Sequence, residues 1–237
     1  MKRQRWWVFE KEPLWAEIAL LIFAGKGIQF GEFKLKMHEK HADAPLSPIY
    51  INLRGEPKGP FSPKTLAQLG YHLARRVLGT TAVGQHIVGI PEAGVPLAES
   101  CFTTLQYTQT NISLLKLNKN VSVEGRKIGT ELTGEFKVGD SANLIDDLIT
   151  AADTKLEAVE SLRANGVRVR NCFVIVDREQ GGREQLENTG VQLYALTTLT
   201  ELLRFYAEIG LVAPEKVEEV FDYRRRVDEY LATQEKK

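Results

Sequence analysis

Two adjacent carboxylates, Asp146 and Asp147, stand inside an otherwise apolar and small-residue segment that reads NLIDDLITAADTK over residues 143–155. Neighbouring carboxylates repel each other unless a cation or a set of hydroxyl donors uses them. The small residues of Thr150–Ala152 would let backbone amides approach a ligand, and the N-terminus of the helix that follows favours an anion. The segment therefore predicts a sugar-phosphate site, with acids for the ribose hydroxyls and a loop for the phosphate.

The same segment has a second interpretation as an acidic turn. Asp153 is of a type that often caps a helix N-terminus with its side chain. A carboxylate at that position would repel a phosphate or occupy the amides that the phosphate needs. Residues 143–155 alone leave both interpretations open.

A second polar pair, Asp177-Arg178, follows a run of mainly apolar residues, 167–176. The planar guanidinium of an arginine can donate two parallel hydrogen bonds to a carboxylate. Arg178 therefore either binds the carboxylate of a ligand or pairs at the surface with Asp177 or Glu179.

Alternating helices and strands must position these groups. Pro13 suits the first turn of a helix that Gly25 ends, and Ser62 suits the N-cap of a second helix that begins at Pro63. The predicted helices span 13–24, 62–79, 95–107, 154–164, 182–188, 200–208 and 214–232, and the predicted strands span 47–53, 86–90, 111–115, 142–145, 167–176 and 191–196. We interpret 118–139 as a long loop or an extended hairpin. This order predicts a mostly parallel sheet covered on both faces, with ligands beyond the carboxyl ends of the strands.

Bulk properties narrow the class of partner. The 31 basic residues balance 31 acidic ones, so no broad nucleic-acid surface is expected. The longest apolar run, Ile18–Ala24, is far too short to span a bilayer, and with no signal-peptide pattern we expect a cytoplasmic protein. Cys101 and Cys172 both lie in apolar stretches and are expected to be buried thiols.

Residues 143–155 resemble the PRPP-binding motif of type I phosphoribosyltransferases, in which apolar strand residues precede two acids and a Thr/Gly-rich loop. Four further segments resemble the orotate phosphoribosyltransferase branch and occur in that family's order: GEFKLK (31–36), SPIYINLR (47–54), VGIPEAGVPLA (88–98) and VDREQGGREQL (176–186). The resemblance covers roughly Phe23 to Glu219, and the five segments together are far more specific than any one.

The resemblance implies an α/β fold with a mostly parallel central sheet flanked by helices and a small N-terminal hood. We divide one structural domain into an N-terminal helix and base-side hood (1–60), a phosphoribosyltransferase core (61–212) and a C-terminal helix (213–237). Because the family shares loops across its interface, the resemblance also implies a homodimer.

The implied activity is the formation of orotidine 5′-monophosphate and pyrophosphate from orotate and PRPP, a step of pyrimidine synthesis. Mg²⁺ would bridge the pyrophosphate and the sugar hydroxyls, with Asp146 and Asp147 assisting indirectly. Arg178 would bind the orotate carboxylate, and the 91–94 turn would bind pyrophosphate. The implied catalytic residues are Lys116, Lys119, Asp146 and Asp147. The implied substrate-binding residues are Lys36, Tyr50, Asn52, Glu92, Ala93, Gly94, Thr150, Ala151, Ala152, Asp153, Thr154 and Arg178. For Tyr50, packing in the core is the alternative role.

Several positions depart from the family pattern. Leu115 stands at the family's loop arginine and Val121 at its histidine, while Ala152 replaces a glycine and Asp153 a hydroxyl residue or glycine. The connection 37–46 is also longer than in the family, and its histidines, His38 and His41, are expected to be solvent-exposed rather than to contact substrate or metal. Two alternatives to the enzyme follow: a non-catalytic relative that binds a nucleotide or base as a regulator, and a phosphoribosyltransferase for another base.

Overall fold

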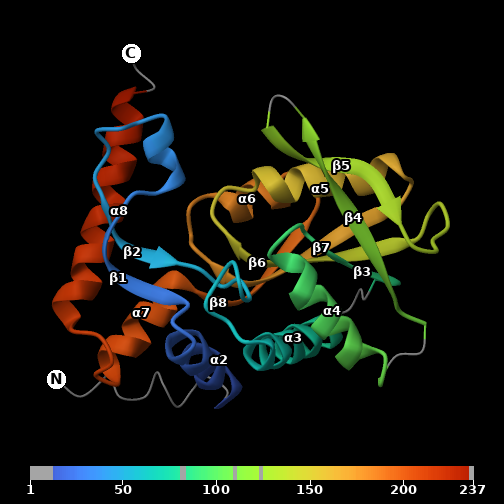
Figure 1. Ribbon diagram of the computed structural model, residues 1–237, viewed down its shortest axis with the longest axis horizontal. Coiled ribbons are helices and arrows are strands. Elements are labelled where there is room, and N and C mark those ends of the chain that lie inside the picture. The colour runs from blue at the N-terminus through green and yellow to red at the C-terminus, as the bar shows by residue number, and fades with distance from the viewer. Residues whose placement is uncertain (1–12, 81–83, 109–110, 123–124, 235–237) are drawn as a thin grey trace.

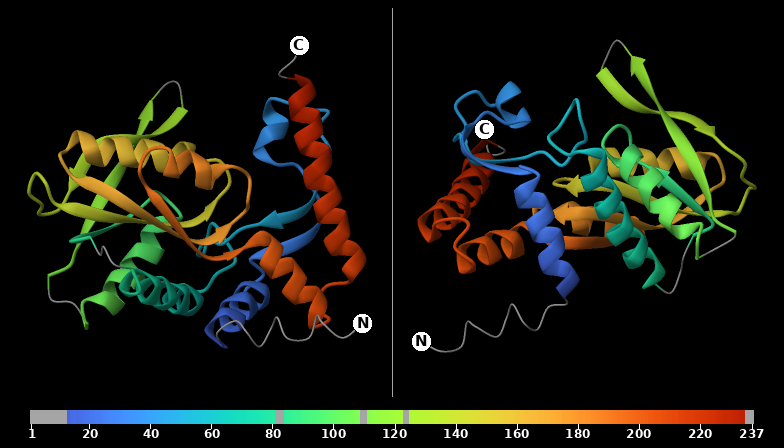
Figure 2. Two further views of the ribbon diagram at one scale, coloured as in Figure 1. Left: turned by 180° about the vertical axis from the view of Figure 1, so that it is seen from behind. Right: turned by 60° about the horizontal axis from the view of Figure 1, so that its bottom comes forward.

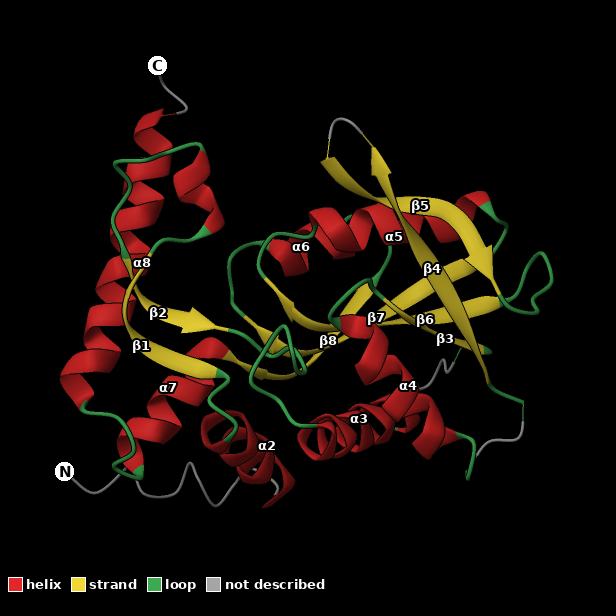
Figure 3. Ribbon diagram, viewed as in Figure 1, coloured by secondary structure: helices red, strands yellow, loops and turns green. Residues whose placement is uncertain are grey.

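A six-stranded sheet with helices on both faces occupies most of the molecule (Figure 1; Figure 3). The computed structural model describes residues 13–80, 84–108, 111–122 and 125–234. The strand order is β5-β4-β3-β6-β7-β8. These strands are β3 (His86–Gly89), β4 (Ser113–Ser122), β5 (Gly125–Thr133), β6 (Ser141–Ile149), β7 (Arg168–Asp177) and β8 (Gln192–Thr198). Every neighbouring pair is parallel except β4 with β5, which confirms the predicted mostly parallel sheet.

Two apolar cores, one on each face of the sheet, hold the helices in place. Helices α3 (Pro63–Leu78) and α4 (Gly94–Leu105) share one core with β3, and α5 (Asp153–Ala164) and α6 (Gly182–Glu187) share the other. Both cysteines are buried, as predicted, one in each core. The nearly continuous burial of β6 and β7 is what a strand covered on both faces requires.

A small N-terminal hood lies beside the main sheet, against the C-terminal helix (Figure 2). It contains the antiparallel pair β1 (Ile28–Phe33) and β2 (Ser47–Ile51), and the short 3-10 helix η1 (Lys36–Glu39). The surrounding helices are α2 (Pro13–Ala24), α7 (Leu199–Glu208) and α8 (Pro214–Gln234). The hydroxyl of Tyr206 on α7 donates a 2.7 Å hydrogen bond to the carbonyl oxygen of Ala19 on α2. The division of the chain at residues 60 and 212 remains a prediction.

Local signals placed several boundaries correctly. Helix α2 has the predicted bounds, and the Ser62 hydroxyl accepts a 3.2 Å hydrogen bond from the amide of Thr65, as an N-cap should. Gly166, with φ of 77°, follows α5 in the left-handed conformation that commonly ends a helix.

Two strands differ from prediction, and the 118–139 stretch takes one of its two predicted forms. Strand β6 does not end at Ile145 but continues to Ile149, because β7 goes on pairing with it at Leu148 and Ile149, so the two acids lie within the strand. The 118–139 stretch contains the greater part of a β4–β5 hairpin, the second of the two predicted forms. Strand β1 was not predicted.

Across the described ranges, every helix is too short or too polar to cross a membrane.

Candidate active site

The strand register brings four of the predicted segments to one edge of the sheet. Gly89 at the end of β3 is paired with Lys116 on β4 and with Ile145 on β6. Ile149 at the end of β6 is paired with Asp177 on β7, and the amide of Arg178 donates a 2.9 Å hydrogen bond to the carbonyl oxygen of Ile149. Because these strands are parallel, their following loops meet at the carboxyl edge, where such sheets bind ligands.

The two acids are buried, and a lysine that the sequence analysis did not single out neutralises one of them. Lys155 Nζ donates to Asp146 Oδ2 at 2.6 Å and to the carbonyl oxygen of Leu148 at 2.7 Å. The other oxygen of Asp146 accepts from the amide of Asp147 at 2.9 Å. A signal for Lys155 existed: it lies three residues before Ala158 on the buried face of α5, where a lysine needs a partner.

The two neighbouring carboxyls lie in different electrostatic environments. Burial, reinforced by the charge of Asp146, raises the pKa of Asp147 to about 7. Burial lowers the pKa of Lys155, but the charge of Asp146, its hydrogen bond to Lys155 and the charge of Asp147 act in the opposite direction, and the net shift is upward. Asp146 is therefore paired with Lys155 inside the protein, whereas the carboxyl of Asp147 is the one that can bind a proton or contact a ligand.

The loop after β6 is tied to α6 at two points. The amide of Ala152 donates a 2.8 Å hydrogen bond to Gln185 Oε1, and the amide of Gly182 donates a 3.0 Å hydrogen bond to the carbonyl oxygen of Thr150. A Cβ on Gly182 would lie 2.5 Å from that oxygen, so the close approach requires glycine. The amide of Ala152 is thus engaged within the protein rather than presented to a phosphate.

The N-cap of α5 is Ala152, not Asp153, so the predicted Asp153 cap is wrong. Asp153 is the first residue of the helix and is exposed, as are Ala151 and Thr154. Its negative charge interacts favourably with the dipole of α5. The carboxylate lies, however, at the end of the loop that the family resemblance assigns to a 5-phosphate.

Gly94, predicted to admit pyrophosphate, is required by packing. A Cβ there would lie 2.2 Å from the carbonyl oxygen of Ile145 on β6, and its amide already donates to Ile90 O at 2.9 Å. Beside it Ala93 is half-buried, and the preceding residue, Glu92, forms an ion pair with Lys58. Lys58, which the sequence analysis also missed, therefore balances the acid in the turn.

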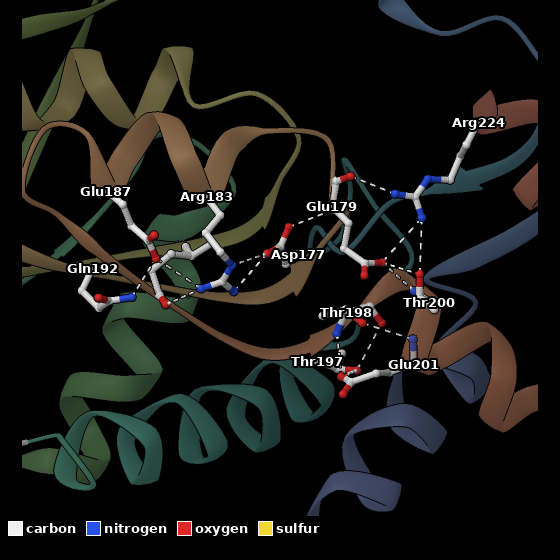
Figure 4. Close-up of polar contacts among 11 residues, drawn as sticks. Asp177, Glu179, Arg183, Glu187, Gln192, Thr197, Thr198, Thr200, Glu201 and Arg224 are labelled. Atoms are coloured by element: carbon white, nitrogen blue, oxygen red, sulfur yellow. Dashed lines mark hydrogen bonds and ion pairs between the residues drawn. The ribbon is translucent and has the colours of Figure 1, made fainter. Parts of the chain in front are cut away.

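Arg178 has none of the acidic partners that its surface alternative requires. Its Nε is buried and has no hydrogen-bond partner among the described residues. Asp177 instead pairs with Arg183 at 3.0 Å, and Glu179 pairs with Arg224 at 3.5 Å (Figure 4). The alternative in which Arg178 pairs with Asp177 or Glu179 is wrong for the described structure. Burial lowers the pKa of Arg178, and the charge of Arg224 adds to that effect while Tyr223 opposes it.

The base-side residues lie on the hood. Tyr50 is 38% exposed, so its core-packing alternative is wrong, and its ring centroid lies 5.5 Å from that of Phe33. The side-chain amide of Asn52 donates a 3.3 Å hydrogen bond to the carbonyl oxygen of Lys58. Lys36 begins η1, but its side chain lies outside the described part of the structure.

The histidines of the longer connection 37–46 are half-buried and not the solvent-exposed residues predicted. His38 Nδ1 accepts a 2.9 Å hydrogen bond from the amide of Leu35, and Nε2 lies 3.2 Å from the carbonyl oxygen of Ala44. The His41 ring meets Tyr230 of α8 edge-on at 5.9 Å. These contacts hold the connection together and against α8.

The two predicted lysines lie on β4. Lys116 is largely exposed and forms a 3.4 Å ion pair with Glu99 of α4. The side chains of Lys119 and Val121 lie outside the described part of the structure. Leu115, which stands at the family's arginine, is buried in the second core, so β4 uses that position for packing.

Comparisons with known proteins agree with this architecture. No family model matches the chain. The chain is 30% identical over 175 residues to an orotate phosphoribosyltransferase of Methanocaldococcus jannaschii, which covers 74% of this chain and 89% of the relative. It is 29% identical over 197 residues to a uridine 5′-monophosphate synthase of Bos taurus, covering 82% of this chain. The solved structure of Leishmania donovani UMP synthase matches 93% of the chain with a TM-score of 0.70 and 25% identity.

Fold and site together define a type I phosphoribosyltransferase, with a mostly parallel sheet whose carboxyl edge carries two buried acids and a half-buried arginine with a buried Nε. Within that class, the chain belongs to the orotate phosphoribosyltransferase family. It spans 37% of the length of the Bos taurus synthase and 43% of the Leishmania donovani chain.

Proposed function

We propose that the chain transfers the phosphoribosyl group of PRPP to a ring nitrogen of orotate, releasing pyrophosphate and forming orotidine 5′-monophosphate in pyrimidine synthesis. The observation that carries this proposal is Arg178, whose buried Nε has no partner and whose strand neighbours the one that bears Asp147. A buried guanidinium Nε without a hydrogen-bond partner is costly, and the carboxylate of orotate would supply the missing partner. Relatives named for this reaction cover most of the chain.

Each group at the edge has a part in the reaction. Arg178 would hold the orotate carboxylate, and Asp147 would accept hydrogen bonds from the ribose hydroxyls. The Asp147 carboxylate would also stabilise positive charge that develops on the sugar as the bond to pyrophosphate breaks. Lys116 lies on β4 at the same edge and would favour the departing pyrophosphate, while Lys155 pairs with Asp146 and holds its carboxylate in place.

Mg²⁺ belongs to the proposal as the cofactor that neutralises pyrophosphate charge when bound. The described residues include no cluster of three or more acidic, histidine or cysteine side chains that could hold a metal, and both oxygens of Asp146 are already hydrogen-bonded. This fits a cation that arrives on the oxygens of PRPP, with Asp147 as the main protein contact.

Two further parts of the proposal rest on the family resemblance. A homodimer would let the β4–β5 hairpin of one subunit, which carries Lys119, reach the site of the other. A cytoplasmic location is part of the same proposal.

A second function, a non-catalytic protein that binds a base or nucleotide, is favoured by two observations. Leu115 is part of the apolar core where the family has an arginine, and Asp153 is exposed where a phosphate would sit. A phosphoribosyltransferase for another base is the third possibility, since the 37–46 connection reshapes the hood.

A pyrophosphate-release assay with PRPP, orotate and Mg²⁺ tests the enzyme directly. We expect turnover that requires all three components and that falls at least 100-fold in D147N, on the order of the loss when a transition-state contact is removed. Orotate binding measured by calorimetry without any turnover would favour the non-catalytic function. Uracil or another base turning over in place of orotate would support the third.

A further inference from the structure

The turn that carries Arg178 is clamped by a residue from the far end of the chain. Arg224 on α8 donates from Nη2 to the carbonyl oxygen of Glu179 at 2.8 Å, and its Nη1 lies 3.5 Å from the Glu179 carboxylate (Figure 4). The same Nη1 donates to the hydroxyl of Thr200 at 3.4 Å. One guanidinium therefore contacts both the backbone and the side chain of the residue that follows Arg178.

Glu179 needs such support because of its backbone conformation. Its φ is 58°, in the left-handed region that residues with a side chain rarely adopt. Its carboxylate accepts hydrogen bonds from the amide and hydroxyl of Thr200 at 3.0 and 2.6 Å, and its own amide donates to Asp177 Oδ1 at 2.8 Å. The contacts with α7 and α8 thus hold an unfavourable turn in a single shape.

The ion pairs around Arg178 show how Arg224 affects it. Arg224 neutralises Glu179, the acid next to Arg178, and so keeps its carboxylate from becoming the partner of Arg178. Asp177 on the other side is already taken by Arg183. With both neighbouring acids engaged, the Arg178 guanidinium keeps its charge for a ligand.

The residue before Arg224 connects the same helix to the longer hood connection. Tyr223 is buried, and its hydroxyl lies 3.9 Å from Met37 Sδ. Burial raises the pKa of Tyr223, and a hydrogen bond with Ser47 and the charges of Arg178 and Arg226 oppose that shift. Together with the His41–Tyr230 contact, this makes α8 a bridge between the 37–46 connection and the Arg178 turn.

We infer that Arg224 is a positioning residue that acts through Glu179: by holding the turn and occupying the Glu179 carboxylate, it keeps Arg178 available for a base that bears a carboxylate. The inference rests on the proposed function, because it takes orotate as the ligand of Arg178. It assigns a role in choosing the base to α8, which lies outside the five segments shared with the family.

The test compares orotate and PRPP affinities in four variants. We expect R224A to weaken orotate about tenfold, by the loss of one charge-assisted contact and the release of Glu179 toward Arg178, and to change the dissociation constant of PRPP less than about threefold. R225A is the matched control: Arg225 is the next residue on α8, is exposed and pairs with Asp222 within the helix, so both affinities should stay at wild-type values.

Two further variants separate positioning from general damage. R224K keeps the charge but loses the forked contact, so it should fall between wild type and R224A; it also carries the test if R224A does not fold. In R224A/E179Q the neutral amide cannot compete as an anion, so orotate affinity should recover by severalfold over R224A. The KM for orotate should follow these dissociation constants while kcat changes less.

The outcomes distinguish this inference from the proposed function. An unchanged orotate affinity in R224A, equal weakening for both substrates, or no recovery in the double variant would overturn the role of Arg224 while leaving the reaction intact. Wild-type protein that does not bind orotate at all would overturn both. Orotate binding without turnover would defeat only the proposed reaction, since the affinity comparison still holds.

Discussion

The buried pair of Lys155 and Asp146 permits the sharpest test of the site's energetics. The perturbation is Lys155→Met, which keeps the length of the side chain and removes its charge. Both side chains are only 6% exposed, so the pair lies beyond the screening that weakens surface ion pairs. Removing Lys155 leaves Asp146 with one amide donor and deprives the Leu148 carbonyl of its donor as well.

The expected loss of unfolding free energy at pH 7 is about 4 kcal/mol. Breaking a buried ion pair from one side costs about 3–5 kcal/mol, because the remaining charge has no compensation. Because the raised pKa of Lys155 keeps the lysine charged at neutral and acidic pH, the contribution of the pair is fully present at pH 7.

The assay is urea unfolding followed by circular dichroism at pH 7 and pH 5. The matched control is Lys216→Met on α8, where the ion pair with Glu219 has the same 2.6 Å separation but both side chains are about half exposed. That variant should lose no more than about 1 kcal/mol at either pH. A K155M deficit no larger than that of K216M would refute the account of the buried pair.

Three further perturbations address the site itself. In the unliganded protein, burial and the charge of Asp146 raise the pKa of Asp147 from 3.8 to about 7, so the folded state binds a proton that the unfolded state has lost. The free energy of unfolding should therefore fall as the pH rises from about 4 to 7. D147N should flatten that slope in urea titrations, and an unchanged slope would contradict the assignment. D153T should tighten PRPP about threefold by calorimetry, because it removes an exposed carboxylate from the helix N-terminus that faces the 5-phosphate; an unchanged dissociation constant would count against that repulsion. R178A should weaken orotate about 30-fold while leaving PRPP within about threefold, and equal loss for both ligands would disprove the carboxylate role.

Local patterns predicted much of the fold because the residues that begin and end helices act over short stretches of sequence. Pro13 and Gly25 mark the ends of α2, and Ser62-Pro63 marks the start of α3, through capping and backbone restrictions that operate within a few residues. The end of β6 was missed because two acids read as a strand terminus. They remain in the strand because β7 pairs beyond them and Lys155 supplies a buried positive charge.

The contacts that shape the site depend on segments distant in the sequence, and no local pattern encodes them. Arg224 lies 45 residues from Glu179, and the pairing decides that Arg178 has no acidic neighbour available. Lys58 lies 34 residues from Glu92 and changes the charge of that turn. The residue types at the site could be predicted, whereas their partners required the packing of α8 and of the hood.

The two links between α6 and the loop after β6 have a thermodynamic consequence. Ala152 and Thr150 are bonded to Gln185 and Gly182, which continue the segment that begins at Arg178, so the loop assigned to PRPP and the turn assigned to orotate form one hydrogen-bonded unit. When a ligand makes one part rigid, the other part becomes more ordered too. Binding of the second ligand then costs less conformational entropy. Cooperativity of this kind must be reciprocal: the factor by which PRPP tightens orotate equals the factor by which orotate tightens PRPP.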